Sequence, residues 1–201
     1  MLNAIPPRRR PRSFPLAAGV PHDLIPARFP ITDRTNLVLP LAAPGAKDPT
    51  AGYGKTLRKK LRRHPGDRLT PATPDDVIAT YRAEVGKRIG LRKSHYATVR
   101  RLMTVSAPGF TPNLFSLVNE AGEVLATGFF PTYRGRTINL FGASTPAGYR
   151  ADGMARLLHA VIEHRRAAGD HNFDFEGSNL PGVAAFFRSF GPREEPYIAL
   201  G

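Results

Sequence analysis

The pattern of apolar residues predicts two helices in the middle of the chain. The first begins at Thr73, whose side chain can cap a helix, and carries two acids in its first turn. Its apolar residues recur at helical spacing, and it ends near Gly86 or Gly90. The second helix starts at Ser94 and stops at Pro108, because proline interrupts a helix.

After residue 110 the period of the pattern changes from helical to extended. Asn113–Asn119 and Val124–Tyr133 predict a hairpin around the turn 120–123, and Thr137–Ala143 predicts a third antiparallel strand. A third helix then begins near Gly153 and ends at Gly169. Its apolar stripe at i, i+3, i+4, i+7 and i+8 indicates one buried face. The stripe comprises Met154, Leu157, Leu158, Val161 and Ile162.

A short strand, a short helix and a last strand complete the predicted order α-α-β-β-β-α-β-α-β. These three elements occupy 171–175, 181–190 and 195–200. Such an order is typical of an α+β domain with three α/β layers, in which helices flank a mixed, mostly antiparallel sheet.

Residues 1–50 differ from the rest because ten of them are prolines that break any helix. The apolar run Thr35–Leu39 predicts one short strand, and the remainder is typical of an extended or disordered leader. We therefore expect two parts: a basic, Pro-rich leader over 1–50, partly disordered or the remnant of a first half-domain, and a folded domain over 51–201.

Charge is also distributed unevenly along the chain, with most of the excess in the first 70 residues. The net charge is +13. Residues 1–70 hold 14 Lys and Arg against 4 Asp and Glu, whereas residues 71–201 hold 15 against 12. A polyanionic partner would therefore meet the front of the chain first.

Composition also bounds the compartment and the chemistry. The chain has no Cys, which excludes disulfides and thiolate nucleophiles and suits a reducing compartment. No apolar run is long enough for a transmembrane helix, so a cytoplasmic protein without membrane insertion is expected. His159 and His164 lie five apart, which does not match a helical zinc motif, and no metal is expected.

The basic segment 52–64 predicts a short amphipathic helix with Leu57 and Leu61 on one side. Three interpretations of its cations stay open: a solvated face, a contact for anionic substrate groups, or a nucleic-acid patch. In the third case Lys55–Arg63 would contact tRNA through phosphates.

The segment Arg150-Ala-Asp-Gly153-Met-Ala155 lies between a predicted strand and the third helix. A helix N-terminus presents unpaired N–H groups and a positive dipole end, which favour a pyrophosphate. Gly153 would let the backbone approach the phosphates, and the small Ala155 would keep the way clear. Gly153→Val is accordingly expected to weaken binding of the ligand that carries this pyrophosphate, without unfolding the domain.

This segment and the order of elements resemble the GNAT (Gcn5-related N-acetyltransferase) superfamily, whose acyl-CoA motif is (Gln/Arg)-x-x-Gly-x-(Gly/Ala). The stretch Asp174–Asn179 and the following Ala184–Gly191 with Pro196-Tyr197 resemble the narrower FemAB-like (BioF2-like) acyltransferases. The resemblance covers about residues 55–201. Those families are typically built from two GNAT-like halves, and this chain has room for one.

The resemblance implies a GNAT-type acyl-CoA N-acyltransferase fold and a site for acetyl-CoA or another acyl-CoA. The pantetheine arm would lie between the strands 137–143 and 171–176, and an amine acceptor would attack the thioester directly. Glu176 is the first candidate for the general base, and Asp174 is the second by period-two alternation. The implied cofactor-binding residues are Gly142, Ala143, Arg150, Ala151, Asp152, Gly153, Met154, Ala155 and Asn179.

The chain departs from the family pattern at the general acid. The short helix 181–190 offers Phe186 and Phe187 where many GNAT enzymes have a Tyr. Tyr149 and Tyr197 are the remaining nearby tyrosines, and Tyr197 is taken as the candidate. Glu176 also has a structural interpretation, as a cap of that helix or a partner of Arg188.

Three functions are therefore compatible with the sequence. The first is an acyltransferase, most simply an acetyltransferase, that moves an acyl group from acyl-CoA to an amine. The second is a FemAB-like transferase that moves an aminoacyl group from aminoacyl-tRNA to a cell-wall precursor. The third is an inactive GNAT-like binding module.

Overall fold

The computed structural model describes residues 14–16, 30–41, 48–63, 66–86, 88–176 and 180–200. Its strands are β1 (Phe14–Leu16), β2 (Ile31–Pro40), β3 (Arg68–Pro71), β4 (Phe110–Val118), β5 (Val124–Tyr133), β6 (Arg136–Ile138), β7 (Phe141–Ser144), β8 (Asn172–Asp174) and β9 (Arg193–Leu200). Its α-helices are α1 (Lys55–Leu61), α2 (Pro74–Tyr81), α3 (Lys93–Thr104), α4 (Pro146–Arg150), α5 (Gly153–Ala167) and α6 (Pro181–Arg188). A 3-10 turn (Pro49–Gly52) precedes α1, and a π-helical turn (Arg82–Gly86) extends α2.

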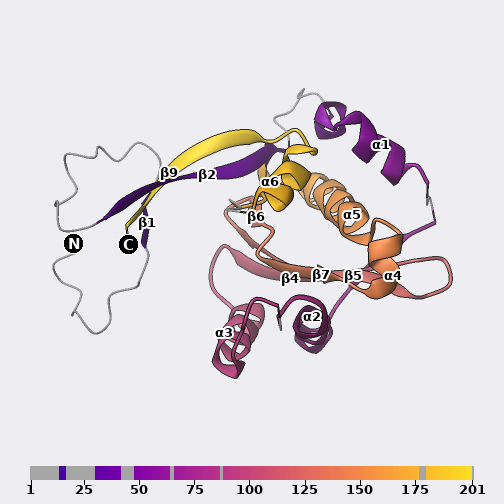
Figure 1. Cartoon of the computed structure of the whole chain (residues 1–201), viewed down its shortest axis with the longest axis horizontal. Helices are drawn as coiled ribbons and strands as arrows, with labels where there is room; N and C mark the ends of the chain where they lie inside the picture. The colour runs from indigo at the N-terminus through magenta and orange to yellow at the C-terminus, as the bar shows by residue number, and fades with distance from the viewer. Residues whose placement is uncertain are drawn as a thin grey trace.

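All the described strands join one sheet in the order β1-β9-β2-β8-β6-β5-β4-β3, and β7 pairs with β5 beyond the end of β6. Only β6 and β8 pair in parallel; every other described pair is antiparallel. Helices cover both faces (Figure 1). The predicted α+β class, with a mixed and mostly antiparallel sheet flanked by helices, is confirmed.

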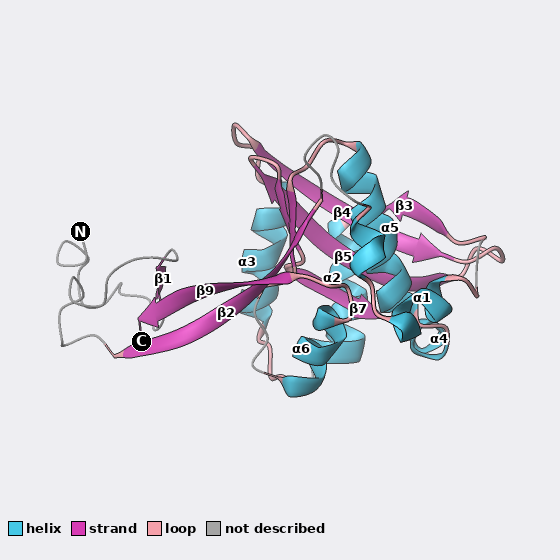
Figure 2. Cartoon of the chain, turned by 90° about the horizontal axis from the view of Figure 1, so that it is seen from above, coloured by secondary structure: helices cyan, strands magenta, loops and turns pink. Residues whose placement is uncertain are grey.

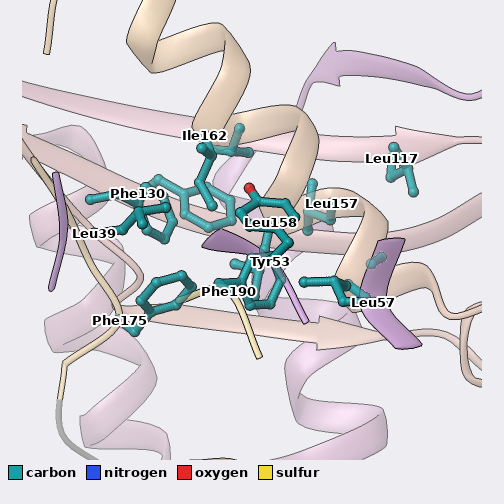
Figure 3. Close-up of a cluster of buried hydrophobic side chains, with 14 of the residues drawn as sticks. Leu39, Tyr53, Leu57, Leu117, Phe130, Leu157, Leu158, Ile162, Phe175 and Phe190 are labelled. Atoms are coloured by element: carbon teal, nitrogen blue, oxygen red, sulfur yellow. The ribbon is translucent and has the colours of Figure 1, made fainter. Parts of the chain in front are cut away.

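The two faces of the sheet bury separate cores. Successive residues of a strand point to opposite faces, and Phe129 and Phe130 on β5 show this directly. Phe130 lies in the larger core with α5, α1 and α6, whereas Phe129 lies in the smaller core with α2 and α3. Figure 3 shows the larger core, in which Leu157, Leu158 and Ile162 of α5 meet the sheet.

Most predicted elements are found within two or three residues of their expected ends. β5 has the predicted bounds, and α2 has the expected capping box between Thr73 and Asp76. The third predicted strand is instead broken into β6 and β7 around residues 139–140. Three elements, β1, β3 and α4, were not predicted.

The strand expected at 35–39 exists and is longer, since β2 runs over ten residues from Ile31. It lies between β8 and β9, inside the sheet. In both views β2 and β9 run together away from the helices as an arm (Figures 1 and 2). The domain division at residue 50 stays a prediction, and most of the predicted leader lies outside the described residues.

Candidate active site

The sheet opens between β6 and β8, and we call this opening the fork. These strands share three parallel pairs, from Arg136↔Asn172 to Ile138↔Asp174, and the bond from Asn139 N–H to the Asp174 carbonyl (2.8 Å) is the last between them. Beyond it residues 141–144 follow β5, while the Phe175 N–H donates to Leu37 on β2 (2.9 Å). The two segments therefore separate at the place where the pantetheine arm was expected to lie.

A β-bulge marks the start of β7 on one side of the fork. The Leu140 N–H donates to the Phe129 carbonyl (3.3 Å), although Phe141 is the register partner of Phe129. Two residues of this strand thus oppose one residue of β5, which bends the strand and increases its local twist.

The bulge also determines which backbone groups of β7 face the fork. The Thr145 N–H donates to the Leu125 carbonyl (2.9 Å), so this pair is hydrogen-bonded and, by alternation, so is Thr127/Ala143. Ala143 therefore directs its backbone groups toward β5, and Gly142 directs its own away from it. Among the described strands β7 pairs only with β5, which leaves the Gly142 groups at an open edge.

The N-terminus of α5 lies beside this edge because α4 and α5 meet closely on β5. A Cβ at Gly148 would lie 1.7 Å from the Leu125 carbonyl oxygen, and a Cβ at Gly153 would lie 2.9 Å from the Gly148 Cα. Both positions therefore require glycine for packing. Gly153→Val would therefore also shift the backbone of α4 or α5, and the expectation that the domain stays folded in this variant remains a prediction.

The loop at the start of α5 has free backbone donors and one cationic contact. The first backbone bond of the helix is from the Arg156 N–H to Asp152 (3.2 Å), and no bond within the described residues uses the N–H groups of 153–155. Asp152 has a φ of 56° and accepts a hydrogen bond from Lys60 Nζ (2.6 Å), which ties α1 to the loop. Arg150, at the end of α4, is exposed.

The other predicted loop residues have mixed positions. Ala155 was expected to keep the way clear for the phosphates by its small size. It is instead buried in the larger core. Met154 and Ala151 are half-buried, and Met154 lies against the β7 backbone, with its Cε 3.5 Å from an ideal Cβ at Gly142. Asn179 lies outside the described residues.

The buried carboxylate of Asp174 stands at the base of the fork. Arg136 donates to Asp174 Oδ2 from Nε (2.9 Å) and Nη2 (2.7 Å), and the Glu176 N–H donates to its other oxygen (2.7 Å). Arg136 also contacts Glu195 on β9 (2.9 Å). These contacts hold Asp174 as a structural anchor, which disfavours it as a base.

Glu176 is half-buried and has a different conformation from the one expected. Its φ of 57° takes it out of the extended region, so the alternation that placed it on the same side as Asp174 does not apply. Burial raises the pKa of its carboxyl, and the negative charge of Asp174 raises this pKa further. Arg188 pairs with Glu194 (2.8 Å), so the expected alternative partner of Glu176 is engaged elsewhere.

The comparison with known families decides the identity. A sequence model of the acetyltransferase (GNAT) domain matches residues 54–188, which is more than half of the chain. This chain belongs to the GNAT acetyltransferase family. Among curated proteins none matches the sequence.

Solved structures share the fold of this GNAT domain at low sequence identity. FemX has a TM-score of 0.64 at 14% identity, over 90% of this chain and 63% of that one. A conserved protein of unknown function from Bacteroides thetaiotaomicron has 0.59 at 18%, over 89% and 64%. L-PGS from Bacillus licheniformis has 0.54 at 14%, over 86% and 62%. The chain thus spans less than two thirds of the length of these structures.

The two tyrosines considered as the general acid of this GNAT domain lie on other elements than Glu176. Tyr197 pairs with Arg34, and β2 separates β9 from β8. Tyr149 is 57% exposed on α4, on the β7 side of the fork. Sequence reasoning missed Arg136, because its partners lie 38 and 59 residues away and no local pattern links them.

Within the described residues of this GNAT domain, no helix is long and apolar enough to cross a membrane. The same residues contain no group of three or more side chains that could hold a metal ion.

Replacing Arg136 tests the anchor at the base of the fork. Arg136→Gln leaves the buried Asp174 without its cation, and we expect the free energy of unfolding to fall by about 3–5 kcal/mol, as for a broken buried ion pair. Urea denaturation at pH 7 measures this.

The matched control is Arg193→Gln, because Arg193 contacts the same Glu195 (2.9 Å) but is 58% exposed. An exposed pair contributes about 1 kcal/mol or less. Equal losses in the two variants would show that Asp174 is not the anchor.

Proposed function

We propose that this protein transfers an acyl group, most simply acetyl, from acyl-CoA to an amine. The observation that carries the proposal is the fork, where the free backbone groups of Gly142 lie beside the uncapped N-terminus of α5. The family match supports it, because the GNAT family is defined by an acetyltransferase domain.

In this proposal the donor substrate lies along the open edge of β7. The pyrophosphate binds the free N–H groups of residues 153–155, where the helix dipole favours an anion, and Arg150 adds a positive charge. Ala151 and Asp152 form the same loop. The thioester carbonyl meets the outward N–H of Gly142, which would also stabilise the oxyanion that forms during attack. Ala143 lies next to Gly142 on the strand, but its N–H is directed toward β5 and not toward the donor.

Glu176 is the proposed general base. Its ionised carboxylate takes a proton from the acceptor amine, the amine nitrogen forms a bond to the carbonyl carbon, and the bond from carbon to sulfur breaks. The departing thiolate is protonated by the proton that Glu176 took up or by solvent. A raised pKa makes a carboxylate a stronger base, which suits this role.

A FemAB-like aminoacyltransferase is the second candidate. The fold likeness to FemX and the basic face of α1 and its C-terminal end support it. Lys55, Arg58, Lys59, Arg62 and Arg63 are exposed there, and phosphate contacts need no other residue type. In that case the donor would be an aminoacyl-tRNA and the acceptor a cell-wall precursor.

Titration with acetyl-CoA separates the two candidates and tests the loop. We expect saturable binding by calorimetry, weakened about tenfold or more by Arg150→Glu, because a negative charge then faces the pyrophosphate. Arg101→Glu makes the same charge change at an exposed site on α3, across the sheet, and should leave affinity within about twofold.

Loss of affinity in both variants alike would contradict the placement of the loop. If acetyl-CoA does not bind and a charged tRNA does, the aminoacyltransferase replaces the first proposal.

The pH profile of acyl transfer tests Glu176. The base must be ionised, so kcat/KM should fall as the pH drops through the Glu176 pKa, which lies above the ordinary value of 4.5. Glu176→Gln should remove this limb and lower kcat by about 100-fold or more. Glu194→Gln, at an exposed position, is the control. An unchanged profile in Glu176→Gln would show that another group is the base.

A further inference from the structure

The arm formed by β2 and β9 has one edge along which no described strand lies. On this side of β2 the last backbone bonds within the described residues are from the Phe175 N–H to the Leu37 carbonyl (2.9 Å) and from the Leu37 N–H to the Glu176 carbonyl (3.3 Å). β8 pairs with β2 only over residues 38–40, whereas β2 continues over residues 31–36. In the described part of the chain a strand position beside β2 is therefore vacant, and it begins at Glu176.

Alternation shows which backbone groups of β2 point toward this position. The Leu41 N–H donates to the His171 carbonyl (2.9 Å), and Leu37 bonds on the same side. Every second residue of β2 therefore directs its N–H and C=O there, and Thr35 is the next one along the arm. The register partner of Thr35 on β9 is Pro196, which has no N–H, in agreement with a pair whose backbone groups point outward.

The opposite edge of the arm is protected against a further strand. There β9 pairs with β1 at residues 198–200. Nearer the base of the arm the outward-facing residue is Pro196, which cannot donate a hydrogen bond. Proline on an edge strand is one way in which sheets avoid further pairing. β2 has no proline over residues 31–39, so it keeps its outward donors.

The vacant position leads away from Glu176 along the arm (Figures 1 and 2). β8 is antiparallel to β2 and runs toward the arm. A peptide that continues this line in the direction of β8 therefore has its N-terminal amine beside the proposed base. The opposite direction would bring a C-terminal carboxylate beside the carboxylates of Glu176 and Asp174, and like charges repel each other.

We propose that the acceptor is the N-terminal amine of an extended peptide, which adds to β2 as an antiparallel strand. The inference rests on the proposed acyl transfer and specifies its acceptor. Thr35 exchanges backbone hydrogen bonds with the peptide, which selects an extended chain rather than one sequence. The amine gives a proton to Glu176, its nitrogen bonds to the thioester carbonyl carbon, and the carbon–sulfur bond breaks. The products are an N-acyl peptide and CoA, whose thiolate takes up a proton.

Acetyl transfer from acetyl-CoA by the full chain tests the proposal. The acceptors are an octapeptide of alternating Thr and Val with a free N-terminus and a C-terminal Lys, the same peptide with a formylated N-terminus, and threonine amide. We expect kcat/KM for the free octapeptide to exceed that for threonine amide about tenfold or more, because only the octapeptide forms the strand bonds. Mass spectrometry should place the acetyl group on the N-terminal amine. Equal rates for octapeptide and threonine amide, or acetylation of the Lys side chain, would overturn the proposal.

Backbone methylation of the octapeptide distinguishes an added strand from other modes of binding. In an added strand alternate N–H groups point toward β2, and the others point away from it. N-methylation of the second and fourth residues and N-methylation of the third and fifth should therefore differ. One pair should lower kcat/KM about tenfold or more, and the other should change it less than about twofold. Equal effects of the two pairs would rule out strand addition.

Proline substitutions locate the edge. Thr35→Pro removes an outward N–H from β2, and Glu194→Pro makes the same change on the outer edge of β9. We expect Thr35→Pro to lower the ratio of kcat/KM for octapeptide to that for threonine amide about fivefold or more, and Glu194→Pro to change it less than about twofold. Equal losses would overturn the assignment to β2.

Calorimetry with acetyl-CoA separates this inference from the proposed function. If acetyl-CoA does not bind, both are overturned. If acetyl-CoA binds and amines are acetylated without preference for the octapeptide, the proposed function stands and the peptide acceptor is overturned.

Discussion

Backbone hydrogen bonds hold β6 and β8 together over three residue pairs and then end, and the geometry of the candidate site depends on where they end. Arg136 and Asp174 sit at that point. Their ion pair holds the strands in register, while Asp174 also fixes the Glu176 backbone (2.7 Å). Beyond this point Phe175 hydrogen-bonds to β2 on one side, and β7 pairs with β5 on the other. Each of the two diverging segments therefore keeps a hydrogen-bonded neighbour.

Packing on β5 places the helix that serves this opening. Gly148 brings α4 against the Leu125 carbonyl, and Gly153 brings the first turn of α5 against Gly148, with no room for a Cβ at either contact. The bulge at Leu140 meanwhile orients the Gly142 backbone toward the opening. The two features on which the proposed acyl-CoA site depends, an unpaired strand edge and a free helix N-terminus, thus arise from backbone geometry rather than from reactive side chains.

Local patterns were sufficient for the elements that bury one regular face. The stripe of α5 and the cap of α2 are encoded within a few residues, and both were predicted with nearly correct ends. β3 escaped prediction because its four residues, which include Pro71, have no clear alternation. α4 escaped because it is a single turn with a glycine at its centre.

The site was predicted less well, because its geometry depends on contacts between distant residues. The motif at 150–155 located the loop, yet the packing roles of Gly153 and Ala155 follow from Leu125 and the core. Alternation failed at Glu176 because its backbone leaves the strand. The position of β2 between β8 and β9 is likewise a long-range pairing that no periodicity encodes.

The central claim is that the donor occupies the fork, and hydrogen exchange of the protein with and without acetyl-CoA tests it most directly. The account predicts slower exchange in peptides that contain residues 142–144 and 153–155, with no change in α2 and α3. Protection confined to α2 and α3, or no protection anywhere at saturating acetyl-CoA, would contradict it.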